Sequence, residues 1–179
     1  MEIIPVVDKK NNVIGLENRK IVHEKGMLHR GVHIIIFNSK GEILLQRRSA
    51  KKDICPLLWD LSVAEHIKPD ESYDAAAKRG IREELGIKNM KLEMVRGMHL
   101  DKNDYERNLK DYEFVELYKG TFVELHAGKY DGKIKIDPEE VKEAGFYPMS
   151  KVEELKKEGK LTPWFLDEWN WIKKNGIVH

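Results

Sequence analysis

The sequence LSVAEHIKPDESYDAAAKRGIREELGI, residues 61–87, is the most informative part of this chain. Its first part reads as a loop, and the rest reads as a helix. Ser72 can cap the first free amides of that helix, and Asp74 lies at the positive end of the helix dipole. Gly86 suits a left-handed cap at the C-terminal end. Apolar residues recur every four positions at Ala77, Ile81 and Leu85. The pattern predicts an amphipathic helix with one narrow apolar face.

Two neighbouring carboxylates, Glu83 and Glu84, lie near the end of this predicted helix. Adjacent carboxylates repel one another, and a hard divalent cation such as Mg²⁺ or Mn²⁺ relieves that repulsion by binding their oxygens. The alternative is an ordinary solvated polar face, which is what most charge pairs on surface helices form. The pair alone therefore leaves a metal site and a polar surface both open.

The spacing of the whole stretch resembles the signature of the Nudix hydrolases. That signature runs Gly, five residues, Glu, seven residues, Arg-Glu, an aliphatic residue, any residue, Glu-Glu, any residue, Gly and an aliphatic residue. The matching positions are Glu71, Arg79, Ile81, Glu83, Glu84, Gly86 and Ile87.

The resemblance implies an α/β protein with the Nudix fold, an α/β/α sandwich around a mixed β-sheet, formed by a single domain over residues 1–179. It also implies Mg²⁺- or Mn²⁺-assisted attack of water on a diphosphate. Glu83 and Glu84 would then be metal ligands, while Arg79 and Glu71 would hold helix and loop together.

Two positions depart from the signature. Glu65 stands where the opening glycine belongs, and Gly80 stands where the first glutamate of the helix belongs. A glycine inside a helix costs about 1 kcal/mol relative to alanine, so Gly80 needs a reason. One hypothesis is a spatial exchange, in which the Glu65 carboxylate enters the space that Gly80 leaves open and restores the missing ligand. The alternative is that the third carboxylate is lost and activity is weak or altered.

A second resemblance, to the type 1 isopentenyl-diphosphate isomerases, covers more of the chain. The residues that carry it are Leu28-His29, Phe37-Asn38, Lys40-Gly41, Arg47-Arg48, Trp59, Ser62-Val63, His66 and Thr162-Pro163-Trp164. Those enzymes bind a divalent metal through three histidines and two glutamates, and they move protons with a cysteine and one of these glutamates.

Several of those metal ligands carry over to this chain. His66 and His29 match well, whereas His23 matches only with a one-residue gap. Asp111 and Glu113 are two apart, so they share one face of a strand and fall where the paired glutamates would. The cysteine does not carry over, because its place is Ala64, which can neither donate nor accept a proton. A histidine on a strand is also often a hydrogen-bonded part of the fold rather than a ligand.

We therefore expect a divalent-metal-dependent hydrolase of a small-molecule diphosphate linked to another moiety, such as a nucleoside diphosphate derivative. The expected metal ligands and catalytic carboxylates are Glu83, Glu84, Glu65 and Glu113, with His66 and His29 as further metal ligands. Arg47 or Arg48 is expected to contact phosphate, and Trp164 to line the substrate pocket. The alternatives are a protein like the isopentenyl-diphosphate isomerases and a module that binds a diphosphate without turning it over. The substrate itself is not specified by the sequence.

Composition limits the other classes of function. The chain has 179 residues with 41% hydrophobic and 35% charged content, enough for one globular domain. Its net charge of +1 gives no support for a nucleic-acid polymer or a membrane as partner. Cys55 is the single cysteine, which excludes an internal disulfide and fits a reducing compartment. No apolar run approaches the ~20 residues that span a bilayer, so we expect a cytoplasmic protein. The apolar strand at residues 2–7 could pair across a homodimer.

The remaining elements are predicted from local patterns. A β-branched run at 32–37, the turn Asn38–Gly41 and the strand 42–48 predict a hairpin. Residues 19–26 look like a polar linker, and 51–59 like a loop. Further predictions are strands at 2–7, 13–15, 113–118, 121–125 and 145–147, a turn at 130–133, and helices at 151–157 and 164–174.

Overall fold

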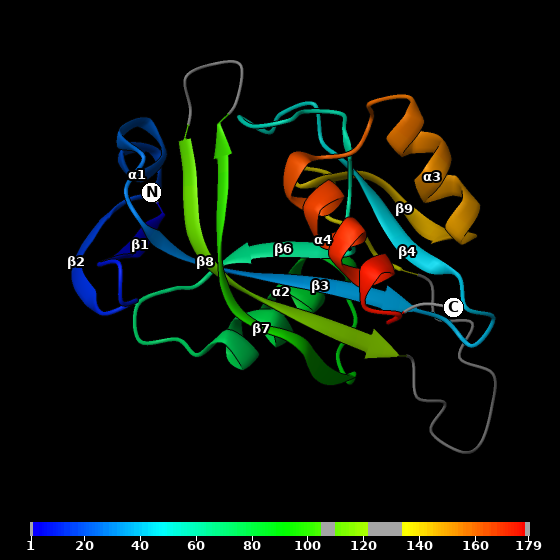
Figure 1. Ribbon diagram of the computed structural model, residues 1–179, viewed down its shortest axis with the longest axis horizontal. Helices are drawn as coiled ribbons and strands as arrows, with labels where there is room; N and C mark the ends of the chain where they lie inside the picture. The colour runs from blue at the N-terminus through cyan, green and yellow to red at the C-terminus, as the bar shows by residue number, and fades with distance from the viewer. Residues whose placement is uncertain (1, 105–109, 122–133, 178–179) are drawn as a thin grey trace.

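The protein is described by a computed structural model that covers residues 2–104, 110–121 and 134–177. For residues 98–104 and 110–121 the description is limited to the backbone. The elements run in the order β1 (Ile3–Val7), β2 (Val13–Asn18), α1 (Arg19–Lys25), β3 (His29–Phe37), β4 (Ile43–Arg48), β5 (Trp59–Asp60), β6 (Val63–His66), α2 (Tyr73–Leu85), β7 (Lys91–Asp104), β8 (Lys110–Thr121), β9 (Val141–Tyr147), α3 (Met149–Lys157) and α4 (Pro163–Lys174) (Figure 1).

Strand β3 is the centre of a mixed seven-stranded sheet. It pairs in parallel with β8 along its whole length, from His29 opposite Glu113 to Phe37 opposite Thr121. Its other partners are antiparallel: β6 faces its first half, and β4 joins it only at the hairpin end. Strands β5 and β9 pair with β4, and β7 pairs with β8. The predicted hairpin is confirmed, and its first strand begins earlier than expected.

The two faces of the sheet bury different helices, because side chains alternate along a strand. Val32, Ile34 and Ile36 of β3 pack in one core cluster with Ala77 and Ile81 of α2. The opposite face of the sheet packs against the other two long helices. That second cluster contains Ile35, Phe37, Leu45, Val152, Leu155, Phe165 and Trp169. Helix α2 thus covers one face and α3 and α4 cover the other, which confirms the α/β/α arrangement expected from the sequence (Figure 1).

The N-terminal part forms a separate two-stranded ribbon, β1–β2, followed by the short helix α1. The expectation of a polar linker at 19–26 was wrong. Asn18 caps α1 by accepting a hydrogen bond from the Lys20 amide, and Gly26 ends the helix in the left-handed conformation with φ of 60°. Val22 packs with Ile4 and Val6, which holds the helix against the ribbon.

Helix α2 forms as predicted, but the loop before it is partly β-structure. Ser72 accepts a hydrogen bond from the Ala75 amide at 3.2 Å, and Gly86 provides the left-handed cap. Strands β5 and β6 replace part of the expected loop. Residues 122–125 and 130–133, where a strand and a turn were expected, lie outside the described residues. In the described part of the chain, none of the helices is both long and apolar enough to cross a bilayer.

Candidate active site

A cavity of about 760 Å³ opens where the N-terminal ribbon, the sheet and helix α2 meet. Strand β6 forms one wall with Ala64, Glu65 and His66, and α2 adds Glu83 and Glu84. Basic residues also line it, namely Arg19, Arg48, Lys51, Lys52, Lys68 and Arg79. The cavity therefore combines carboxylates, histidines and cations, the groups required to hold metal ions and an anionic ligand.

Glu65 occupies the space above Gly80. A Cβ atom placed on Gly80 would lie 2.6 Å from Cγ of Glu65 and 2.8 Å from Cγ1 of Val63, both closer than atoms can pack. Because position 80 has no side chain, the Glu65 side chain can pack directly against the backbone of α2. Its carboxylate consequently lies beside Glu84, in the region where the signature has a helix glutamate.

Buried Glu84 and half-buried Glu65 form a mutually repelling pair. Burial raises the pKa of Glu84 well above its usual value, and the nearby Glu65 charge raises it further. Burial also raises the pKa of Glu65, although the Arg79 guanidinium opposes this effect. Gln46 donates a hydrogen bond from Nε2 to Oε2 of Glu84 at 3.0 Å. Two neighbouring carboxylates that are shielded from the solvent are a hard oxygen donor set, so these residues fit a divalent cation.

Arg79 is the residue that holds this region together. Its Nε and Nη2 donate to the two oxygens of Glu71 at 2.9 and 3.0 Å. Nη1 donates to Oε2 of Glu65 at 2.7 Å, and Nη2 also donates to the His66 carbonyl at 2.8 Å. Glu83 is more weakly held, at 3.4 Å from Nη1, and its side chain is 48% exposed. The guanidinium thus orients Glu65, while Glu83 keeps access to the solvent.

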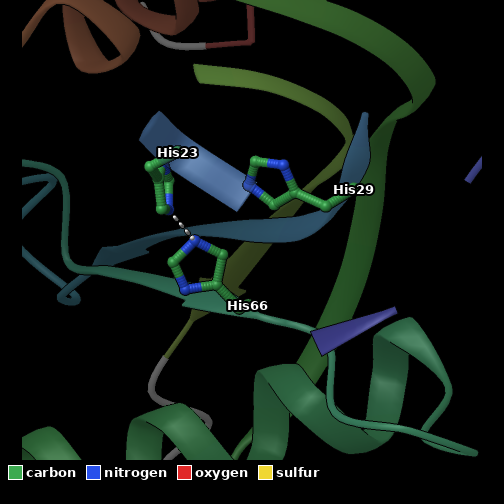
Figure 2. A group of neighbouring side chains, drawn as sticks. All are labelled: His23, His29 and His66. Carbon is green, nitrogen blue, oxygen red and sulfur yellow. Dashed lines mark hydrogen bonds between the residues drawn. The ribbon is translucent and has the colours of Figure 1, made fainter. Parts of the chain in front are cut away.

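Three histidines form a second cluster, shown in Figure 2. His23 comes from α1, His29 from β3 and His66 from β6, and one ring nitrogen of each lies within 4.8 Å of the others. Nε2 of His23 and Nε2 of His66 are 3.2 Å apart (Figure 2). Nδ1 of His29 contacts the Met27 carbonyl at 3.0 Å, so Nε2 is the atom with which His29 would bind a metal ion.

The state of the histidines also fits a metal ion. Burial lowers the pKa of His66 well below its usual 6.5, and the charges of His29 and Arg19 lower it further. His66 is therefore neutral near pH 7, the form in which imidazole binds metal. Because Glu65 and His66 are consecutive on β6, their side chains leave opposite faces of the strand. The carboxylates and the histidines are thus two distinct donor clusters at one cavity.

The remaining predicted residues are placed differently. The backbone of Glu113 is paired with His29 across β3 and β8, and its side chain lies outside the description. Arg48 and Trp164 line the cavity. Both are tied to buried Asp60, which accepts from Arg48 Nη1 at 3.0 Å and from Trp164 Nε1 at 2.7 Å.

Arg47 is not brought to the cavity wall formed by the described residues. It donates to the Leu57 carbonyl at 3.0 Å and to Glu143 at 3.2 Å. The pairing of β4 with β9 is irregular between Arg47 and Arg48, and of these two arginines Arg48 is the one that lines the cavity.

The expected site left out His23 and Lys52, which line the cavity, and Gln46, which binds the cavity residue Glu84. His23 was matched only across a gap, and the signal that could have placed it was the Asn18 cap and Gly26 end of a helix. Lys52 and Gln46 carry no motif of their own, and their roles depend on β4 and the following loop reaching α2.

The comparisons with known proteins agree with this geometry. A family described as NUDIX domain matches residues 27–165. An isopentenyl-diphosphate Delta-isomerase of Serratia proteamaculans is 33% identical over 167 residues, which cover 92% of this chain and 88% of that protein. An uncharacterised Nudix hydrolase of Listeria innocua is 33% identical over 155 residues, 86% of this chain and 84% of that protein. A crystal structure of a protein from Deinococcus radiodurans shares the fold, with a TM-score of 0.67 at 19% identity. The match covers 90% of this chain and 92% of the chain in that structure. The chain belongs to the NUDIX domain family.

Proposed function

We propose that this protein is a divalent-metal-dependent hydrolase of a diphosphate linked to another moiety. The observation that carries the proposal is the pair formed by half-buried Glu65 and buried Glu84, made possible by the missing side chain at Gly80. Glu65, Glu84 and the more exposed Glu83 would hold Mg²⁺ or Mn²⁺ at the cavity. When bound, such a cation neutralises diphosphate oxygens and acidifies a water molecule.

The cations that line the cavity support an anionic substrate. Lys51 and Lys52 stand on the loop after β4, where they pair with Glu139 and Glu140. These are exposed or half-exposed pairs, which are weak and exchange readily for a stronger anion. Arg19, the first residue of α1, pairs with Glu2 at 3.5 Å and Asp53 at 3.6 Å. A diphosphate would gain more from these cations than single carboxylates do, because it carries more charge.

The histidine cluster favours a second candidate, a protein that acts on a prenyl diphosphate like the isomerases it resembles. His23, His29 and His66 would hold a second divalent cation there. Ala64 argues against isomerisation by the chemistry those relatives suggest, since its methyl group cannot transfer a proton. A third candidate, a module that binds diphosphates without hydrolysis, remains the alternative if no turnover is found.

The deciding experiment is phosphate or pyrophosphate release from a panel of nucleoside diphosphates, nucleotide sugars and prenyl diphosphates, with and without Mn²⁺. Release that depends on Mn²⁺ supports the hydrolase. Incorporation of deuterium from D₂O into a prenyl diphosphate, without release, favours the isomerase-like candidate. Binding of panel compounds with neither outcome favours the non-catalytic module.

A calorimetric titration of Mn²⁺ tests the role of Glu65 independently of the substrate. Glu65→Gln keeps the size of the side chain but removes its charge, so we expect Mn²⁺ affinity to fall by about tenfold or more. Glu93→Gln, at an exposed position on β7, is the matched control and should bind Mn²⁺ as the wild type does. Unchanged affinity in Glu65→Gln would remove Glu65 from the metal site.

A further inference from the structure

A buried polar network lies on the sheet face that is opposite α2. His33 of β3 is 2% exposed, and its Nδ1 lies 3.1 Å from Oε1 of Glu168 on α4. The other carboxylate oxygen, Oε2, accepts a hydrogen bond from Nη1 of Arg96 at 2.9 Å. Arg96 in turn lies over the Trp171 ring, with Cζ 5.1 Å from the ring centroid.

Burying this network costs more desolvation free energy than a purely structural contact requires. Glu168 is 1% exposed, and removing a carboxylate from water costs several kcal/mol even when it is paired. Apolar residues of similar volume commonly stabilise a core as well or better than such a network. The surrounding cluster of Ile35, Trp164 and Phe165 would accept apolar side chains. This cost suggests that the network serves a function at His33, the member that lines the cavity.

The inner end of the network is at the cavity wall. His33 lines the cavity, as does Ala64, which faces it across the β3–β6 strand pair. His33 and Ala64 therefore border the cavity as neighbours. Trp164, one helical turn before Glu168 on α4, also lines the cavity, so one face of α4 serves both positions.

The hydrogen bond to Glu168 also sets the tautomer of the ring. A carboxylate only accepts hydrogen bonds, so Nδ1 of His33 carries the proton in the neutral ring, and Nε2 is the basic nitrogen. Arg96 holds the Glu168 carboxylate in place by binding its second oxygen. This is the arrangement of a base with an orienting carboxylate behind it.

We infer that His33 is a catalytic proton-transfer residue of the cavity and that Glu168 is its positioning residue. The inference rests on the proposed function. In hydrolysis the water oxygen forms a bond to one phosphorus, and the bridging P–O bond breaks with its electron pair on the leaving oxygen. His33 takes the water proton at Nε2 and passes it to the leaving phosphate or to solvent.

His33→Asn is the sharpest variant, because its amide nitrogen can still donate to Glu168 while the basic nitrogen is removed. We expect kcat to fall about 10²- to 10⁴-fold, the usual contribution of a general base. KM and Mn²⁺ affinity should stay unchanged, since the carboxylate and histidine clusters remain intact. A similar loss in kcat for His33→Asn and for the exposed-site control Glu93→Gln, or a change confined to KM, would overturn the assignment.

Glu168→Gln tests the positioning role with a readout that a structural role would not move. Nitrogen-15 NMR of histidine-labelled protein should show His33 protonated at Nδ1 in the wild type and a mixture of tautomers in Glu168→Gln. We expect a smaller loss of kcat in Glu168→Gln than in His33→Asn. A wild-type His33 protonated at Nε2 alone would contradict the proposal.

A probe that cannot be hydrolysed separates this inference from the proposed function. Methylenediphosphonate with Mg²⁺ should shift the His33 Nε2 resonance in the wild-type protein. If the wild type hydrolyses nothing in the substrate panel, the proposed function fails, but an Nε2 shift with the probe still supports His33 as the proton-transfer group. No shift at His33 under conditions where the probe binds would overturn the inference.

Discussion

At the scale of single residues, Glu65 and Gly80 are linked by exclusion of volume. An alanine in an exposed helix normally gains about 1 kcal/mol over glycine. At position 80 the added methyl group would lie 2.6 Å from Cγ of Glu65, and overpacking of this kind costs about 1 to 3 kcal/mol. We therefore expect Gly80→Ala to lower the free energy of unfolding by about 1 to 2 kcal/mol, measured by urea denaturation.

A double-mutant cycle shows whether the Glu65 side chain causes that cost. Glu65→Ala keeps Cβ, which is at an ordinary 3.5 Å, and removes the Cγ contact. Gly80→Ala should be less harmful in that background, by about 0.5 kcal/mol or more, although the Val63 contact remains. Gly15→Ala, where nothing lies within 4 Å, is the control and should lose no stability. An equal cost in both backgrounds would mean that the Glu65 side chain does not fill this space.

At the scale of elements, the Glu71–Arg79 pair fastens the loop after β6 to helix α2. Burial tends to raise the pKa of Glu71, but hydrogen bonds from Arg79 and the Lys68 amide outweigh it, so the net pKa lies below the usual 4.5. A lowered pKa in the folded state means that the pair stabilises the fold above pH 4.5 and that this stabilisation is lost as the pH falls further.

Glu71→Gln should therefore lower the free energy of unfolding at pH 7 by about 1 to 3 kcal/mol, the usual value of hydrogen bonds to a charged group. The difference from the wild type should shrink as the pH falls below the ordinary carboxyl pKa. Urea denaturation at a series of pH values measures it, with Glu93→Gln as the exposed control. A difference that stays constant down to pH 3 would contradict the assigned role of the pair.

The elements also show which parts of the fold were predictable from sequence. Helix α2 and the β3–β4 hairpin were predicted because their caps, turn and periodicity are local. Strand β6 was read as loop, since its four residues become a strand only by pairing with β3, which is a long-range event. Helix α1 was missed although Asn18 and Gly26 are standard cap residues, because seven polar-rich residues hardly show a period.

At the scale of the whole molecule, the candidate site joins segments that are distant in the chain. The Nudix-like spacing predicted the carboxylates of α2, because they belong to one helix. The two departures from that spacing raised the hypothesis that Glu65 fills the space over Gly80, but only the packing of β6 against α2 could show it. Nor could the spacing show the His33–Glu168 contact, which joins β3 to α4 across 135 positions of sequence. Pairs of this kind are set by the sheet order, not by local pattern.

The histidine cluster leads to a prediction about the stability of the whole fold. His23, His29 and His66 belong to three elements, so an ion bound by all of them would link the N-terminal ribbon to the sheet. An ion that binds only the folded state stabilises it, by about 2.7 kcal/mol at a free concentration 100 times Kd.

Co²⁺ suits imidazole ligands and reports them in its visible spectrum. We expect Co²⁺ to raise the melting temperature, and His23→Gln to reduce that rise and change the spectrum. Lys20→Gln, on the exposed side of α1, should behave as the wild type. An undiminished rise in His23→Gln would show that α1 does not contribute a ligand, and that the contact between His23 and His66 only packs the ribbon on the sheet.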